Sequence, residues 1–140
     1  MSKSYSVRRT INARPETVWA LLTDAASYAD WNPSIVSIKG PIALGETIEL
    51  VSIVNPKRTF KLSVSGFEPP QTMVWSDGMP LGLFKGVRTY RLTPSGDQTE
   101  FSMEEVFSGL MAPLITKAIP DMTDSFNQFA DGLKAGAEAR

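Results

Sequence analysis

The chain has 140 residues, of which 42% are hydrophobic and 21% are charged, and its formal net charge is −1. This length and composition suit one globular domain over residues 1–140 and exclude a disordered chain. The near-neutral charge provides no basic field for nucleic acid, and no apolar run reaches the roughly 18 residues of a membrane span.

Residues 1–12 contain no apolar signal-peptide segment, so we expect a cytoplasmic protein that does not insert into membranes. The sequence contains neither cysteine nor histidine. These absences exclude disulfides, thiolate nucleophiles and cysteine-ligated metal centres, and they remove the commonest general base and transition-metal ligand. We therefore expect no metal and no cofactor, and any catalysis would depend on carboxylates, Lys, Arg, Tyr or water.

The first third of the chain predicts a strand followed by two short helical segments. Residues 4–12 alternate as a strand does. Pro15 and Glu16 then suit the first turn of a helix, because that turn needs no N–H from proline and its dipole favours a carboxylate. A helix is predicted over about 15–23, and a second helical turn over 25–30.

The middle of the chain reads as six strands separated by turns that are rich in Gly, Pro, Asn and Asp. The short connections favour an antiparallel meander. The predicted strands are 35–39, 46–54, 58–67, 71–77, 82–93 and 98–108.

The last two strands form a predicted hairpin with a four-residue turn at 94–97. This register pairs Arg91 with Glu100 on the outer face. It turns Arg88 and Glu105 toward the inner, mostly apolar face, in diagonal positions within reach of each other. A slip of one residue would invert these faces.

Residues 110–138 predict a long helix with a continuous apolar stripe that includes Met122, Phe126 and Phe129. Pro120 lies inside this helix. Because an interior proline removes a helical hydrogen bond, we expect a kink or a split near residues 117–119.

Three stretches of the sequence resemble a known family: INARPETVWALLTDAASYADWNP (11–33), TEFSMEEVFSGLMAPLI (99–115) and GLKAGAE (132–138). They are similar to the START-like, or helix-grip, superfamily (SRPBCC), which includes the birch-pollen allergens, and within it to the bacterial polyketide cyclase/dehydrase and lipid transport family. The resemblance implies an α+β fold, in which a curved antiparallel sheet of about seven strands wraps around a long C-terminal helix, with two short helices after the first strand.

A sheet bent around one helix leaves a concave apolar space, which is a typical ligand site. The candidate ligand contacts are the side chains expected to face this space, together with Trp31 near its entrance, although the first role of the aromatic and Met residues is to pack the core. These candidates are Trp31, Leu62, Val64, Met73, Trp75, Phe84, Arg88, Tyr90, Phe101, Met103, Glu105, Met122, Phe126 and Phe129.

Arg88 and Glu105 are the most informative of these candidates. A buried charge is costly unless it is paired and hydrogen-bonded, so each should contact the other or a ligand. Three interpretations stay open: a structural ion pair in the cavity wall, recognition of a carboxylate or phenol by Arg88, and acid–base chemistry by Glu105.

Three functions are compatible with the sequence. The first is binding or carriage of a small hydrophobic molecule, such as a lipid, a polyketide-like compound or an aromatic compound. The second is a cofactor-free cyclase or dehydratase that uses Glu105, Arg88 or Tyr90 for proton transfer. The third is a protein-interaction module resembling relatives that activate a chaperone ATPase. The sequence allows either a monomer or a homodimer.

Overall fold

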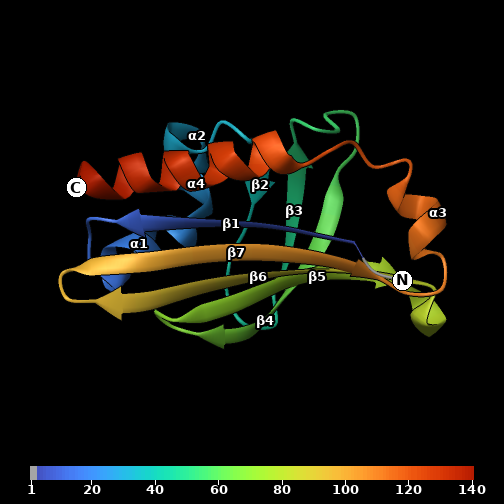
Figure 1. Ribbon diagram of the computed structural model, residues 1–140, viewed down its shortest axis with the longest axis horizontal. Helices are drawn as coiled ribbons and strands as arrows, with labels where there is room; N and C mark the ends of the chain where they lie inside the picture. The colour runs from blue at the N-terminus through green and yellow to red at the C-terminus, as the bar shows by residue number, and fades with distance from the viewer. Residues whose placement is uncertain (1–2) are drawn as a thin grey trace.

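A seven-stranded antiparallel sheet curls around the C-terminal helix in the computed structural model, which describes residues 3–140 (Figure 1). The strand order is β1-β7-β6-β5-β4-β3-β2, so consecutive strands are neighbours except where β1 closes against β7. The strands are β1 (Lys3–Ile11), β2 (Ile35–Lys39), β3 (Thr47–Ser52), β4 (Phe60–Glu68), β5 (Thr72–Met79), β6 (Phe84–Ser95) and β7 (Gln98–Ser108). This arrangement confirms the predicted helix-grip fold.

The helices lie between β1 and β2, between β5 and β6, and after β7. They are α1 (Pro15–Leu22), the short helix η1 (Ala25–Ser27), α2 (Tyr28–Trp31), η2 (Pro80–Gly82), α3 (Ala112–Thr116) and α4 (Thr123–Glu138). Pro15 takes the first position of α1 and Glu16 lies in its first turn, as their chemistry predicts.

The helical region predicted over 110–138 is divided into two helices, in agreement with the split expected near residues 117–119. The chain leaves α3 after Thr116 and begins α4 at Thr123, so the interruption predicted from Pro120 is a complete break. Asp121 stabilises the new helix start, because its Oδ1 accepts hydrogen bonds from both the backbone N–H and the hydroxyl of Thr123.

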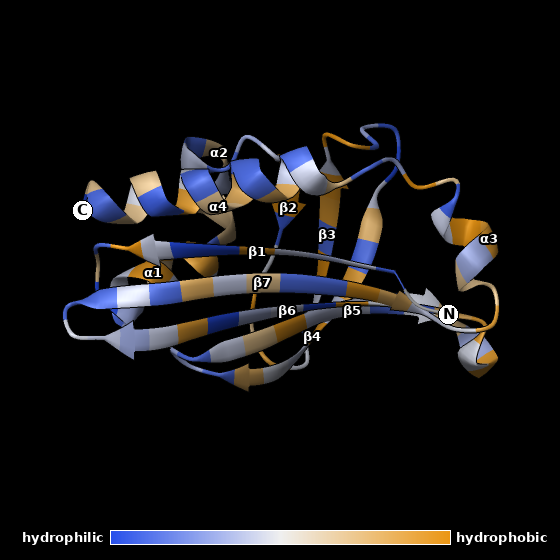
Figure 2. Ribbon diagram, in the orientation of Figure 1, coloured by the Kyte–Doolittle hydropathy of each residue, from blue (hydrophilic) through white to orange (hydrophobic). Residues whose placement is uncertain are grey.

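One face of α4 packs into the hollow of the sheet. Its buried residues Phe126, Phe129, Ala130 and Leu133 recur at helical spacing, so they form a single stripe. Figure 2 shows hydrophilic and hydrophobic patches alternating along this helix, as one buried face requires.

Polar contacts with β1 fix α4 along the edge of the sheet. Arg9 Nε lies 2.7 Å from Asp131 Oδ1, and the Lys134 ammonium donates to the carbonyl oxygen of Thr10. Since these contacts join the first strand to the last helix, they hold the two ends of the chain together.

The hairpin of β6 and β7 has a register two residues away from the predicted one. Ser95 pairs with Gln98, so the turn contains two residues rather than four. On the β5 side, the last backbone hydrogen bond of β6 is the one that Leu92 donates to Gln71, and a proline is tolerated where a strand is paired on one side. Pro94 therefore continues the strand instead of ending it.

This register changes the pairs but not the faces, because the side-chain period of a strand is two. Arg91 lies opposite Ser102, so the predicted pair with Glu100 is wrong. Arg88 and Glu105 lie directly opposite each other rather than in diagonal positions.

Candidate functional site

A cavity of about 470 Å³ lies between the curved sheet, α4 and the segment that joins α3 to α4. Its size is within the usual range for small-molecule sites, about 300–1,000 Å³. The sheet contributes residues from β2 to β7, and the loop between β3 and β4 completes the wall.

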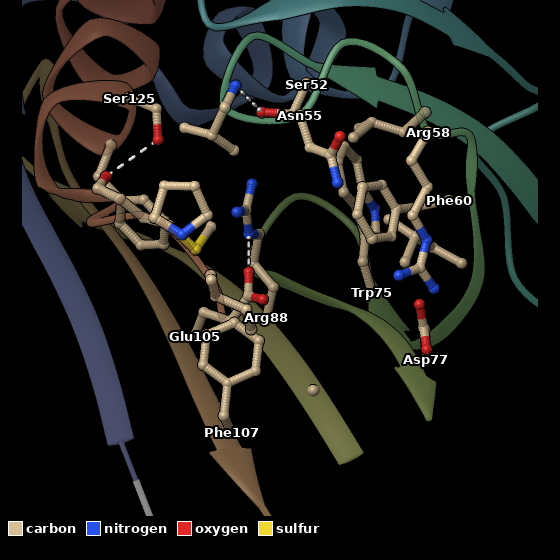
Figure 3. A pocket seen from close by; sticks show the side chains of 18 of the residues that line it. Ser52, Asn55, Arg58, Phe60, Trp75, Asp77, Arg88, Glu105, Phe107 and Ser125 are labelled. Carbon is tan, nitrogen blue, oxygen red and sulfur yellow. Dashed lines mark hydrogen bonds and ion pairs between the residues drawn. The ribbon is translucent and has the colours of Figure 1, made fainter. Parts of the chain in front are cut away.

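Most of the predicted ligand contacts line this cavity, and their common feature is a position on the inner face of the sheet or at α4, with an apolar side chain in all but Arg88 and Glu105. Figure 3 shows several of them around the central space. The predicted residues in the wall are Leu62, Trp75, Phe84, Arg88, Met103, Glu105, Met122, Phe126 and Phe129.

The other predicted contacts lie in the packed core outside the cavity wall: Trp31, Val64, Met73, Tyr90 and Phe101. Phe129 closes the cavity at this end, since its ring lies 5.5 Å from that of Trp31, 5.7 Å from that of Tyr90 and 6.5 Å from that of Phe101. Alternation along a strand identifies the inner face, but it does not show where along that face the helix touches the sheet.

An ion pair stands in the apolar wall of the cavity. Arg88 Nε donates to Glu105 Oε1 at 2.6 Å, and the two side chains are only 15% and 14% exposed. The guanidinium also lies 4.8 Å from the centroid of the Phe126 ring, close enough for a cation–π contact. Glu105 and Phe126 therefore hold the guanidinium in one orientation, with its terminal nitrogens directed into the cavity (Figure 3).

The charge state of Arg88 is secure despite its burial. Burial by itself disfavours the charged form, but the Glu105 carboxylate and the neighbouring Tyr90 outweigh it, so the pKa of Arg88 is raised. The Tyr90 hydroxyl has the opposite character: burial raises its pKa, and the charge of Arg88 offsets only part of that effect. Tyr90 is therefore a neutral hydroxyl near neutral pH.

Two further charges lie near the loop between β3 and β4. Arg58 and Asp77 point toward each other in Figure 3, and Arg58 also lies 4.6 Å from the centroid of the Phe60 ring. Partial burial raises the pKa of Asp77, while Arg58 opposes that shift and Glu105 adds to it. The Asn55 side chain projects into the space beside them.

Several wall residues were not predicted from the sequence. Phe60 and Asp77 continue the same alternation as Leu62 and Trp75, so the strand pattern contained the signal that would have found them. Asn55 lies in a loop, which has no period. The α3–α4 segment also contributes Ile115, Ala118, Ile119 and Pro120, but a wall built at a helix break has no sequence pattern.

The arrangement can bury an apolar molecule and orient it by hydrogen bonds at one place. Among residues 3–140, three or more His, Cys, Asp or Glu side chains do not gather anywhere in a way that could hold a metal ion. Over the same residues, no helix has both the length and the apolar character required to cross a bilayer.

Solved structures of similar shape come from several organisms. A protein from Mesorhizobium loti is 22% identical, with a TM-score of 0.74 and 98% of each chain covered. The Zhui aromatase/cyclase from Streptomyces sp. R1128 is 15% identical, with a TM-score of 0.77, over 100% of this chain and 96% of that one. A norcoclaurine synthase from Thalictrum is 13% identical, with a TM-score of 0.70, and the match covers 98% of this chain and 94% of that one. At these identities the likeness concerns the fold.

One of two sequence comparisons gives a match, and that match agrees with this fold. A comparison with curated proteins gave no match. The family model for polyketide cyclase/dehydrase and lipid transport proteins matches residues 2–138, which is nearly the entire chain. The chain therefore belongs to the polyketide cyclase/dehydrase and lipid transport family.

Proposed function

We propose that this protein binds a small, largely apolar molecule in the cavity between the curved sheet and α4. The observation that carries the proposal is the cavity itself, about 470 Å³ in volume and walled mainly by aromatic and aliphatic side chains. A core of this size normally packs to the density of an organic crystal, so an internal space that exceeds the volume of many water molecules calls for an occupant.

The affinity would come from apolar burial, at about 25 cal/mol for each Å² removed from water, less the cost of association. Arg88 would orient the ligand, because its hydrogen-bond donors interrupt an otherwise apolar wall. The family and its aromatase/cyclase and norcoclaurine synthase neighbours support a role with small organic molecules.

The test is a titration with N-phenyl-1-naphthylamine, a neutral dye that fluoresces in apolar surroundings. We expect saturable binding by the wild-type protein. Ala118 lies in the cavity wall on the exposed α3–α4 segment, so Ala118→Trp should obstruct the cavity and weaken binding at least tenfold without unfolding the chain. Ala135→Trp, on the exposed side of α4, is the matched control and should bind as the wild type does.

Two results would contradict this proposal. Absence of saturable binding by the wild-type protein would leave the cavity without a ligand-binding role. Equal dye affinity in Ala118→Trp and the wild type would place the dye elsewhere on the protein.

A second candidate function is cofactor-free cyclisation of a dicarbonyl compound. It is favoured by the Glu105 carboxylate, which faces the cavity beside a guanidinium that could hold a carbonyl oxygen. Glu105 would take a proton from the carbon next to one carbonyl, and the resulting enolate would attack the second carbonyl. The protonated Glu105 would return its proton to the alkoxide formed by this attack, and the resulting hydroxyketone would lose its hydroxyl group and an α-proton as water to give a cyclic enone.

The cyclisation of 2,6-heptanedione to 3-methylcyclohex-2-enone and water tests this second function by the absorbance of the enone. We expect turnover by the wild-type protein and a loss of at least a hundredfold in Glu105→Gln, which keeps the shape but cannot accept the proton. Equal rates with and without protein would remove the enzymatic alternative and leave ligand binding in place.

A further inference from the structure

The charges of the cavity wall sum to zero. Its only ionisable acids and bases among the described lining residues are Arg58, Arg88, Asp77 and Glu105, two of each sign. The deeper pair is already joined by a short ion pair, so Arg88 has no unbalanced charge to offer a ligand. An ionised ligand group beside it would add a third buried charge without a counter-ion, which is costly.

The hydrogen-bonding capacity of Arg88 is nevertheless incomplete. A guanidinium has five N–H donors, and the contact with Glu105 uses the one on Nε. The terminal nitrogens face the cavity, and the nearby Tyr90 hydroxyl makes no hydrogen bond of good geometry with any described residue. An oxygen of a ligand in the cavity can therefore accept hydrogen bonds from the terminal nitrogens of Arg88.

Neighbouring groups add donors of the same kind. Trp75 lies opposite Arg88 in the ladder between β5 and β6, and its Nε1 is buried and without a hydrogen-bond partner among residues 3–140. Its ring centroid lies 4.8 Å from that of Tyr90. Trp75 and the core residue Tyr90 therefore leave unused donors beside Arg88 without adding a charge to the wall.

We infer that the ligand carries an uncharged hydrogen-bond acceptor, such as a ketone, ester or quinone carbonyl, on its buried end, and that Arg88 receives this oxygen while Glu105 disfavours a carboxylate in its place. This inference rests on the proposed binding function and names the class of its ligand. Glu105 thereby acts as a specificity residue, because its charge cancels the attraction that Arg88 would otherwise exert on anions.

The experiment displaces N-phenyl-1-naphthylamine with three naphthalenes of matched shape: 2-acetylnaphthalene, 2-ethylnaphthalene and 2-naphthoate. In the wild-type protein we expect the ketone to bind at least tenfold more tightly than the carboxylate. A purely apolar cavity would also reject the carboxylate, so the decisive variant is Glu105→Gln. Removal of the negative charge should lower the Kd of 2-naphthoate at least tenfold and change the Kd of 2-acetylnaphthalene less than threefold.

A second variant keeps the test valid if Glu105→Gln does not fold. The double variant Arg88→Met with Glu105→Leu replaces both charges with apolar groups, a change that folds tolerate well. The preference for 2-acetylnaphthalene over 2-ethylnaphthalene should fall about fivefold in it, since one hydrogen bond is lost. An unchanged preference would overturn the role of Arg88.

The outcomes separate this inference from the function on which it rests. If none of the probes binds, the binding function itself fails. If the probes bind but 2-naphthoate equals or exceeds the ketone in the wild-type protein, or Glu105→Gln does not strengthen 2-naphthoate, the cavity is a binding site and the neutral-acceptor assignment is wrong.

Discussion

Arg88 and Glu105 each depend on the other, because both charges lie in an apolar wall with little exposure. Loss of one partner leaves the second charge buried and uncompensated, which typically costs about 3–5 kcal/mol, whereas replacing both with apolar groups is often neutral. We expect Arg88→Met to lower the free energy of unfolding by about 3 kcal/mol, and the double variant with Glu105→Leu to recover most of that loss. Urea denaturation of Arg88→Met, Glu105→Leu and the double variant measures the coupling, and additive losses would show that the two charges do not interact.

Asp77 should make the folded protein less stable as the pH rises, whereas a carboxylate held in an ion pair makes it more stable. Its pKa in the folded protein is raised above the ordinary 3.8, mainly by burial, so the fold favours the protonated form. The protonated Asp77 side chain contributes its full share to the free energy of unfolding below pH 3.8, and this share is lost as the pH rises through the folded pKa. Asp77→Asn should therefore be more stable than the wild type at pH 7, by less than about 1 kcal/mol because the group is partly solvated.

Urea denaturation across a pH series measures this difference. The gain in Asp77→Asn should shrink toward zero as the pH falls to the ordinary range of an aspartate. The control is Glu104→Gln, an exposed residue of β7, which should show no comparable gain. A loss of stability in Asp77→Asn at pH 7 would mean that attraction to Arg58 outweighs the cost of burial.

Among the secondary-structure elements, the packing of α4 on α2 depends on a glycine. A Cβ atom on Gly132 would overlap the carbonyl oxygen of Trp31, so only glycine allows the two backbones to approach this closely. Alanine would improve helix propensity by about 1 kcal/mol, but the two helices would have to separate. We expect Gly132→Ala to lose about 2 kcal/mol net, as overpacked positions do.

Thermal unfolding of matched variants tests this packing. Gly136→Ala is the control, because its added Cβ would lie 3.1 Å from the Cβ of Trp31, a contact that small shifts can relieve. Its loss should be clearly smaller than that of Gly132→Ala. If Gly132→Ala is as stable as the wild type, helix propensity decides the outcome and the close approach has no energetic weight.

The elements were predictable to different degrees, for physical reasons that the last hairpin illustrates. Turn residues and alternation are local signals, so the strands and their inner faces could be predicted. The register depends on where the neighbouring strand ends: Pro94 looks like a turn residue in the sequence, but it continues β6 because β5 pairs no further than Arg91. The break at Pro120 was predicted, whereas the length of the gap before Thr123 was not.

The candidate site shows the same limit. Trp75 and Tyr90 lie on the same face and in contact, yet only Trp75 lines the cavity. Which of two inward side chains meets packed core and which meets open space depends on where Phe129 fills the gap between α4 and the sheet. That position is a property of the assembled fold and has no counterpart in the spacing of residues along one strand.

A ligand bound in the cavity should stabilise the whole protein against unfolding. A ligand that binds only the folded state stabilises it by about 2.7 kcal/mol at a free concentration one hundred times its Kd. For a domain of this length that free energy corresponds to a rise in Tm of roughly 8 °C. We expect N-phenyl-1-naphthylamine to produce such a rise in the wild-type protein and in Ala135→Trp, but little or none in Ala118→Trp. Circular dichroism during thermal unfolding measures the Tm of each protein.

Hydrogen exchange shows where this stabilisation acts. The loop at residues 52–58 and the α3–α4 segment at 115–120 contribute wall residues without a strand partner over most of their length, so they should open most readily in the free protein. A ligand that bridges them to the sheet should slow exchange in both segments more than in β7, whose pairing with β1 and β6 already protects it. A uniform slowing along the chain would indicate stabilisation without a specific closure of these segments, and no slowing despite a raised Tm would place the ligand outside the cavity.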